Sequence, residues 1–132
     1  MKLETLIVDD DPIFVMIAKR IIVSTGFHTS PLTFVNGELA IEHLLKESDP
    51  ETHYAIFLDI NMPIMNGWEF LDAIQLNSME SKTYVFMITS SCSSVDKAKS
   101  SQYPNVLKYF EKPITRQDIL ELKQMDFLKK EI

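Results

Sequence analysis

The alternation of five short apolar or β-branched segments with five segments of helical character constrains the fold more than any other feature. Each apolar segment has the length of a strand and ends in polar or turn-forming residues. The first, third and fourth are nearly continuous hydrophobic runs, which is typical of a parallel sheet covered by helices on both faces. The pattern therefore predicts an α/β fold with a doubly wound, five-stranded parallel sheet. The expected strands are residues 3–8, 28–33, 54–58, 84–88 and 106–110.

Capping and turn residues delimit the expected helices. Asp11 and Pro12 have the pattern of an N-cap followed by proline in the first turn, and Gly26 ends that helix. Gly67 is expected to supply a positive φ in a turn before the third helix. The expected helices are residues 12–25, 37–45, 68–76, 95–101 and 115 to about 128.

Size and charge exclude several classes of protein. The chain has 132 residues, 45% of them hydrophobic, which is the size of one domain with one core. Its net charge is −6 and its basic residues are scattered, so nucleic acid and anionic membranes are not expected partners. The single Cys92 excludes an internal disulfide, and neither a signal peptide nor a membrane helix is visible. We expect a cytoplasmic protein whose residues 1–132 form one domain without an effector domain.

Polar residues end four of the expected strands: Asp9 and Asp10, Asp59, Thr89, and Lys112. Right-handed crossovers place the carboxyl ends of parallel strands along one edge, where ligands bind in such sheets. Carboxylates held about 5 Å apart repel by roughly 3 kcal/mol per pair at an effective dielectric of 20, so a cation is expected among them. Oxygen ligands with room for water favour Mg2+. An aspartate beside Mg2+ and a lysine is suited to attack phosphorus, which predicts an acyl phosphate on Asp59.

Four segments of the chain resemble the signature segments of response-regulator receiver domains, in the family's order and at its spacing. They are residues 6–12, 57–67, 87–90 and 109–113. The resemblance, which extends to the single-domain chemotaxis regulators, implies a flavodoxin-like fold with strand order 2-1-3-4-5. It also implies a two-component or phosphorelay function, in which a histidine kinase or a histidine phosphotransfer protein donates the phosphoryl group. Output would then pass through protein contact to an unidentified downstream target.

The resemblance assigns the ligands of the metal. Asp10 and Asp59 would bind Mg2+ directly, Asp9 closely or through water, and Asn61 through its backbone carbonyl.

It also assigns the groups around the phosphoryl. Thr89 and Lys112 would hold its oxygens, while Tyr109 would change rotamer together with Thr89. Ser90 and the polar residues 92–94 depart from the family's pattern, and these departures concern the output surface.

The sequence leaves two docking residues with alternatives. Phe14, at the start of the first helix and beside the acidic edge, is predicted to contact the histidine-bearing partner, with burial in the core as its alternative. Pro113 is predicted to belong to the same docking region. The resemblance suggests a cis bond between Lys112 and Pro113, and the usual trans form is the alternative.

Two rival functions are less consistent with the residues. A pseudo-receiver would use the same fold as a constitutive interaction module, but it would have no need of Asp59, Thr89 and Lys112 together. A phosphohydrolase with an aspartyl nucleophile needs a second acid two residues on, where this chain has Asn61. We therefore expect no enzymatic activity beyond the domain's own phosphorylation and dephosphorylation.

Overall fold

The structure, a computed structural model, describes residues 2–46, 49–90 and 93–125. Its strands are β1 (Lys2–Val8), β2 (Leu32–Phe34), β3 (Thr52–Asp59), β4 (Thr83–Thr89) and β5 (Val106–Glu111). Its helices are α1 (Pro12–Ser24), α2 (Gly37–Lys46), α3 (Gly67–Leu76), α4 (Ser94–Ser100) and α5 (Arg116–Leu122), with a short 3-10 helix, η1 (Glu80–Lys82). Within the described residues, no helix combines the length and the apolar character needed to cross a membrane.

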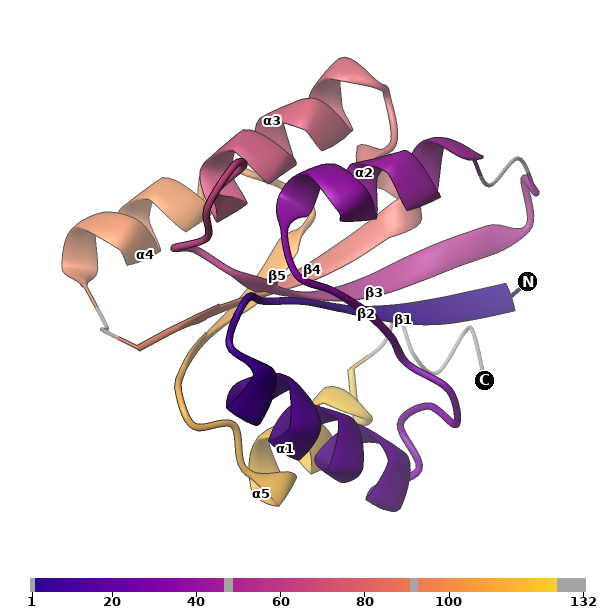
Figure 1. The fold of residues 1–132 in the computed structure, drawn as a ribbon, viewed down its shortest axis with the longest axis vertical. Helices are drawn as coiled ribbons and strands as arrows, with labels where there is room; N and C mark the ends of the chain where they lie inside the picture. The colour runs from indigo at the N-terminus through magenta and orange to yellow at the C-terminus, as the bar shows by residue number, and fades with distance from the viewer. Residues whose placement is uncertain (1, 47–48, 91–92, 126–132) are drawn as a thin grey trace.

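The five strands form one parallel sheet in the order β2-β1-β3-β4-β5, as predicted. Helices α1 and α5 cover one face of this sheet, and α2, α3 and α4 cover the other (Figure 1). The last residues of neighbouring strands are in register, with Val8 opposite Leu58 and Asp59 opposite Ile88. The predicted doubly wound α/β fold is therefore confirmed, and the residues that follow β1, β3 and β4 meet at one edge.

The core consists of two apolar layers, one on each face of the sheet. Alternate residues of a strand point to opposite faces, so Leu6 and Val8 pack toward α2 and α3 while Ile7 packs toward α1 and α5. Phe57 and Phe86 add aromatic packing to the second layer, with their ring centroids 5.1 Å apart. Burial on both faces explains why these strands are continuous hydrophobic runs.

The second strand was predicted too early in the chain. Residues 28–33 were expected, but β2 begins at Leu32, which pairs with Leu6. The preceding residues connect α1 to the sheet: Gly26 adopts a φ of 77°, and His28 Nε2 lies 3.0 Å from the carbonyl oxygen of Leu3. A side chain therefore makes the contact with β1 that a strand backbone would otherwise make.

The last helix is shorter than predicted. It ends at Leu122, where the N–H groups of Gln124 and Met125 bond to carbonyls three residues earlier. The remainder of the predicted helix, after residue 125, lies outside the described residues. The other element boundaries differ from the predicted ones by at most two residues.

Candidate functional site

The end of β1 places two acids at the edge of the sheet and a third at the start of α1. Asp9 is buried, and its Oδ1 accepts a hydrogen bond of 2.9 Å from the backbone N–H of Asp11. Asp11 in turn caps α1, because its Oδ1 accepts from the N–H groups of Ile13 and Phe14 at 3.0 and 3.3 Å. The predicted capping role of Asp11 is confirmed. Asp10 is exposed to solvent.

Asp59 ends β3 beside the start of α3, and Gly67 makes this close approach possible. The N–H of Gly67 donates to the carbonyl of Ile60 at 2.8 Å, and a Cβ on Gly67 would lie 2.7 Å from the carbonyl oxygen of Asp59. The prediction of a positive φ at Gly67 was wrong, since the left-handed residue of this loop is Ile64, with a φ of 71°. Glycine is required at position 67 because the backbone of Asp59 leaves no room for a Cβ atom there. The sequence did not reveal this contact.

Three carboxylates converge at this edge. Asp9, Asp10 and Asp59 each offer an oxygen within 4.8 Å of the others. The ammonium of Lys112 lies 2.8 Å from Asp9 Oδ2 and 3.9 Å from Asp59 Oδ2. Oxygen ligands with one open, solvent-facing side suit Mg2+, which keeps part of its water shell when it binds protein. Three of the four predicted metal ligands, the carboxylates, are therefore brought together, and their hard oxygen donors suit the predicted ion.

Burial makes the charged form of these acids costly. It raises the pKa of Asp59 from 3.8 to about 6, and the charge of Asp9 adds to that rise. The charge of Lys112 and a hydrogen bond from the backbone N–H of Asn61 lower the Asp59 pKa in part. Burial also raises the pKa of Asp9, against the hydrogen bond from Lys112. One lysine does not compensate for three carboxylates, so a further cation is favoured here.

Asn61, which was predicted as the fourth metal ligand, follows Asp59 by two residues. Its backbone N–H is the group that contacts the Asp59 carboxylate, and the role of its carbonyl toward a metal stays a prediction.

Thr89 and Lys112 are linked through the backbone. Thr89 ends β4 and is buried, and the N–H of Lys112 donates to its carbonyl at 2.7 Å. The bond between Lys112 and Pro113 is cis, which decides between the two alternatives left open by the sequence. Pro113 itself is exposed, and its role in docking stays a prediction. The two residues predicted to hold the phosphoryl group are therefore neighbours of the acid cluster.

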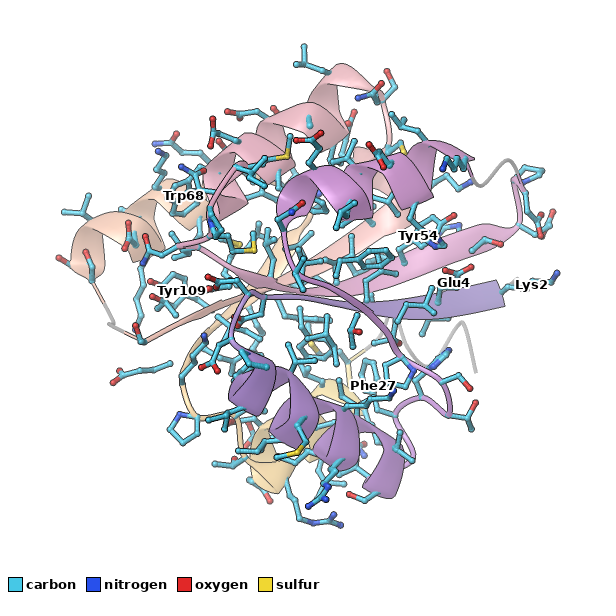
Figure 2. All side chains as sticks on the ribbon, in the orientation of Figure 1. Lys2, Glu4, Phe27, Tyr54, Trp68 and Tyr109 are labelled. Atoms are coloured by element: carbon cyan, nitrogen blue, oxygen red, sulfur yellow. The ribbon has the colours of Figure 1, made fainter. Side chains whose placement is uncertain are left out.

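Tyr109 lies on β5, on the side of the sheet covered by α4 (Figure 2). It is half-buried, packs against the core layer of α2 and α3, and has a buried hydroxyl oxygen. The ammonium of Lys97, on α4, lies 5.9 Å from the centroid of its ring. This contact with α4 was not foreseen from the sequence. The predicted rotamer change of Tyr109 remains a prediction.

Phe14 was predicted to dock a partner, and this prediction was wrong. Its side chain is only 6% exposed and belongs to the core layer beneath α1 and α5. Phe14, Ala18 and Ile22 recur at four-residue intervals and form the buried face of α1. Exposed apolar residues lie on the opposite face, where Ile13 is 65% exposed. Ile13, Ile17 and Ile21 have the same four-residue spacing on another side of α1, so the spacing alone did not identify the buried face.

Residues 91 and 92 lie outside the described residues, so the predictions about Cys92 and its loop are untested.

Comparisons with known proteins agree with this geometry. The model of the family described as "Response regulator receiver domain" matches residues 5–124. The nitrate/nitrite response regulator protein NarL of Escherichia coli K12 is 35% identical over 85 residues, which cover 64% of this chain and 38% of that protein. The chain thus spans well under half the length of the curated relatives it matches.

Solved structures of similar length share the whole fold. The two-component response regulator from Cytophaga hutchinsonii superposes with a TM-score of 0.79 at 30% identity, over 92% of this chain and 95% of that one. A CheY-like receiver domain protein from Methanospirillum hungatei JF-1 gives a TM-score of 0.75 at 29% identity, over 98% and 99%. This chain therefore belongs to the response regulator receiver domain family, the phosphorylatable domain of two-component response regulators.

Proposed function

We propose that this domain accepts a phosphoryl group on Asp59 from a phosphohistidine of a histidine kinase or a histidine phosphotransfer protein, and that the product changes its protein-binding surface. One observation carries the proposal. The ammonium of Lys112 lies between Asp9 and Asp59, at a sheet edge where three carboxylates are within reach of one cation. Positive charge beside a buried carboxylate favours its ionised form, and the ionised carboxylate is the nucleophile toward phosphorus.

The transfer step uses groups whose places are described above. A carboxylate oxygen of Asp59 forms a bond to phosphorus as the P–N bond to the donor's imidazole breaks, and the electron pair of that bond stays on the nitrogen. Lys112 donates to an oxygen of the phosphoryl group, and so does the hydroxyl of Thr89. The metal ligands that we assign are Asp9, Asp10, Asp59 and the backbone carbonyl of Asn61. Bound there, Mg2+ would supply positive charge that offsets the negative charge on the oxygens of the transferring group.

Asn61 restricts this chemistry to the domain itself. An amide cannot act as the general acid that a phosphohydrolase needs two residues after its aspartyl nucleophile. We therefore assign no turnover of external phosphate esters, only formation and hydrolysis of the domain's own acyl phosphate. The pseudo-receiver alternative is not favoured, because it gives no reason for three acids, Thr89 and Lys112 at one edge.

The output follows from the link between this edge and α4. Thr89 ends β4, and Lys112 directly follows β5. A phosphoryl group that draws these two residues toward Asp59 therefore moves the ends of both strands. Tyr109 on β5 meets Lys97 on α4, so a rearrangement of the β5 side chain reaches that helix. We assign the changing protein-binding surface to α4 and β5.

The donor protein is assigned to the exposed face of α1. Ile13, Met16 and Ile17 are exposed apolar residues on this face, and Pro113, directly after Lys112, is also exposed. Further along α1, a groove of about 680 Å3 is lined by Met16 and Val23 together with Lys19, Arg20 and Arg116. An apolar strip with a basic rim suits a helix that carries apolar and acidic side chains.

Phosphoramidate labelling tests the proposal. With Mg2+, intact-mass measurement should detect one added phosphoryl group on the wild-type domain and none on Asp59→Asn. Asp96→Asn, on α4, is the matched control and should label normally. Equal labelling of Asp59→Asn would refute the assignment, and an absence of labelling in the wild type with Mg2+ would favour the pseudo-receiver.

A further inference from the structure

Among the described residues, the ammonium of Lys112 lies close to two acids and to one aromatic ring. Besides Asp9 and Asp59, it faces the ring of Phe14, whose centroid lies 4.6 Å from Nζ. The Lys112 side chain is 16% exposed and Phe14 is buried, so little water reaches the contact. Phe14 is therefore a core residue of α1 whose ring also contacts the Lys112 ammonium.

We propose that Phe14 is a positioning residue for phosphorylation, which holds the Lys112 ammonium at the acidic edge through the face of its ring. An ammonium is attracted to an aromatic face within about 6 Å of its centroid, and the attraction strengthens as water is excluded. An aliphatic side chain of similar size would fill the core equally, but it has no aromatic face to attract the cation on that side.

The ring and the two acids attract the Lys112 ammonium in different ways. Asp9 and Asp59 compete for the ammonium by charge, and a phosphoryl group on Asp59 adds a further anionic acceptor. The ring offers a weaker, broader attraction that allows the ammonium to turn from a carboxylate to a phosphoryl oxygen without leaving its place. Phe14 thus keeps Lys112 inside the site in both states.

This inference rests on the role of Lys112 in the proposed function, and the experiment separates the two. Phe14→Leu removes the ring face and retains an apolar side chain. Its control is Phe27→Leu. Phe27, which is labelled in Figure 2, is also buried and belongs to the same core layer, and its ring packs edge-on against Phe57 with the centroids 5.8 Å apart. Both variants lose a buried ring, but only Phe14 is known to face Lys112. If Phe14→Leu does not fold, Phe14→Met offers a similar volume in an unbranched, flexible chain that adapts to the space left by the ring.

The first measurement is the rate of phosphorylation by phosphoramidate with Mg2+, made in the wild-type and Lys112→Ala backgrounds. Phe14→Leu should slow the wild-type reaction by about tenfold, and by no more than Lys112→Ala does, whereas Phe27→Leu should leave the rate within about twofold. In the Lys112→Ala background, Phe14→Leu should have no further effect, because it acts through the lysine. An equal slowing in both backgrounds would show that Phe14 acts only through the fold and would overturn the inference.

The second measurement does not depend on phosphorylation. In the NMR spectrum, the ring current of Phe14 should shift the Lys112 ε-methylene protons upfield, and Phe14→Leu should abolish this shift while Phe27→Leu preserves it. Absence of the shift in the wild type would overturn the placement of the ring. If the shift is present but Lys112→Ala phosphorylates at the wild-type rate, the proposed role of Lys112 fails, and the positioning role fails with it.

Discussion

Replacing Asp59 by asparagine should stabilise the metal-free domain at neutral pH, although it abolishes phosphorylation. Burial raises the Asp59 pKa from 3.8 to about 6, and its side chain is only 7% exposed, so solvent screens little of this cost. Each pKa unit corresponds to about 1.4 kcal/mol, so ionised Asp59 destabilises the folded state by about 2–3 kcal/mol at pH 7 or above. Asparagine has nearly the same shape and no charge, and it should recover most of that free energy.

The pH dependence has a defined sign. Between about pH 4 and pH 6 the folded state keeps a proton on Asp59 that the unfolded state has lost. The free energy of unfolding of the wild type should therefore fall as the pH rises through this window. Asp59→Asn should lack that part of the slope, and the two proteins should approach each other in stability near pH 4.

Urea unfolding in EDTA, followed by the fluorescence of the half-buried Trp68, measures this difference. Mg2+ should stabilise the wild type more than Asp59→Asn, because the variant lacks one ligand charge. Asp96→Asn is again the control, and its stability should stay within about 0.5 kcal/mol of the wild type. Equal stabilities of the wild type and Asp59→Asn at pH 7.5, or a wild-type stability that is flat between pH 4 and 6, would refute the account of a costly buried charge.

Three further predictions concern the metal, the donor and the loop after Asp59. Asp10→Ala should weaken Mg2+ binding by tenfold or more in a Trp68 fluorescence titration while the fold holds or gains stability, since one repelling charge is removed; unchanged affinity would contradict the ligand role. Ile13→Ala should slow transfer from the cognate phosphohistidine protein by about tenfold and leave phosphoramidate labelling intact, as expected for an exposed docking residue; equal loss with both donors would exclude docking. Gly67→Ala should lower the melting temperature measured by calorimetry, because its Cβ would lie 2.7 Å from the Asp59 carbonyl oxygen, and an unchanged value would show that α3 shifts freely.

The acidic edge was accessible from the sequence because it depends on short-range patterns joined by one topological rule. A continuous apolar run ending in Asp9 and Asp10 marks a buried strand, and a second run ends in Asp59. Parallel strands with right-handed crossovers bring these ends together whatever the details of packing. The four resembling segments then assigned Thr89 and Lys112, and the structure places both beside the acids.

The error at Phe14 has a different origin. Both faces of α1 carry apolar residues, with Phe14 and Ala18 on one side and Ile13 and Ile17 on the other. In such a helix, composition does not distinguish the buried face from the exposed one, and closeness to the site was taken as exposure. Ile13 and Phe14 lie about 100° apart around the helix axis, and contact with the sheet decides which of them is buried.

The sequence by itself determined the α/β class, the parallel sheet and the meeting of the acids with Lys112, because these follow from periodicity and from where each strand ends. Only the tertiary structure decided the rest: which face of α1 is buried, that Gly67 is needed for backbone contact with Asp59, and that a phenylalanine ring lies beside the Lys112 ammonium. These features depend on distances between residues far apart in the chain. Periodicity places a residue on a face of its own helix or strand, but it does not specify what that face packs against, and packing sets both the burial of Asp59 and its raised pKa.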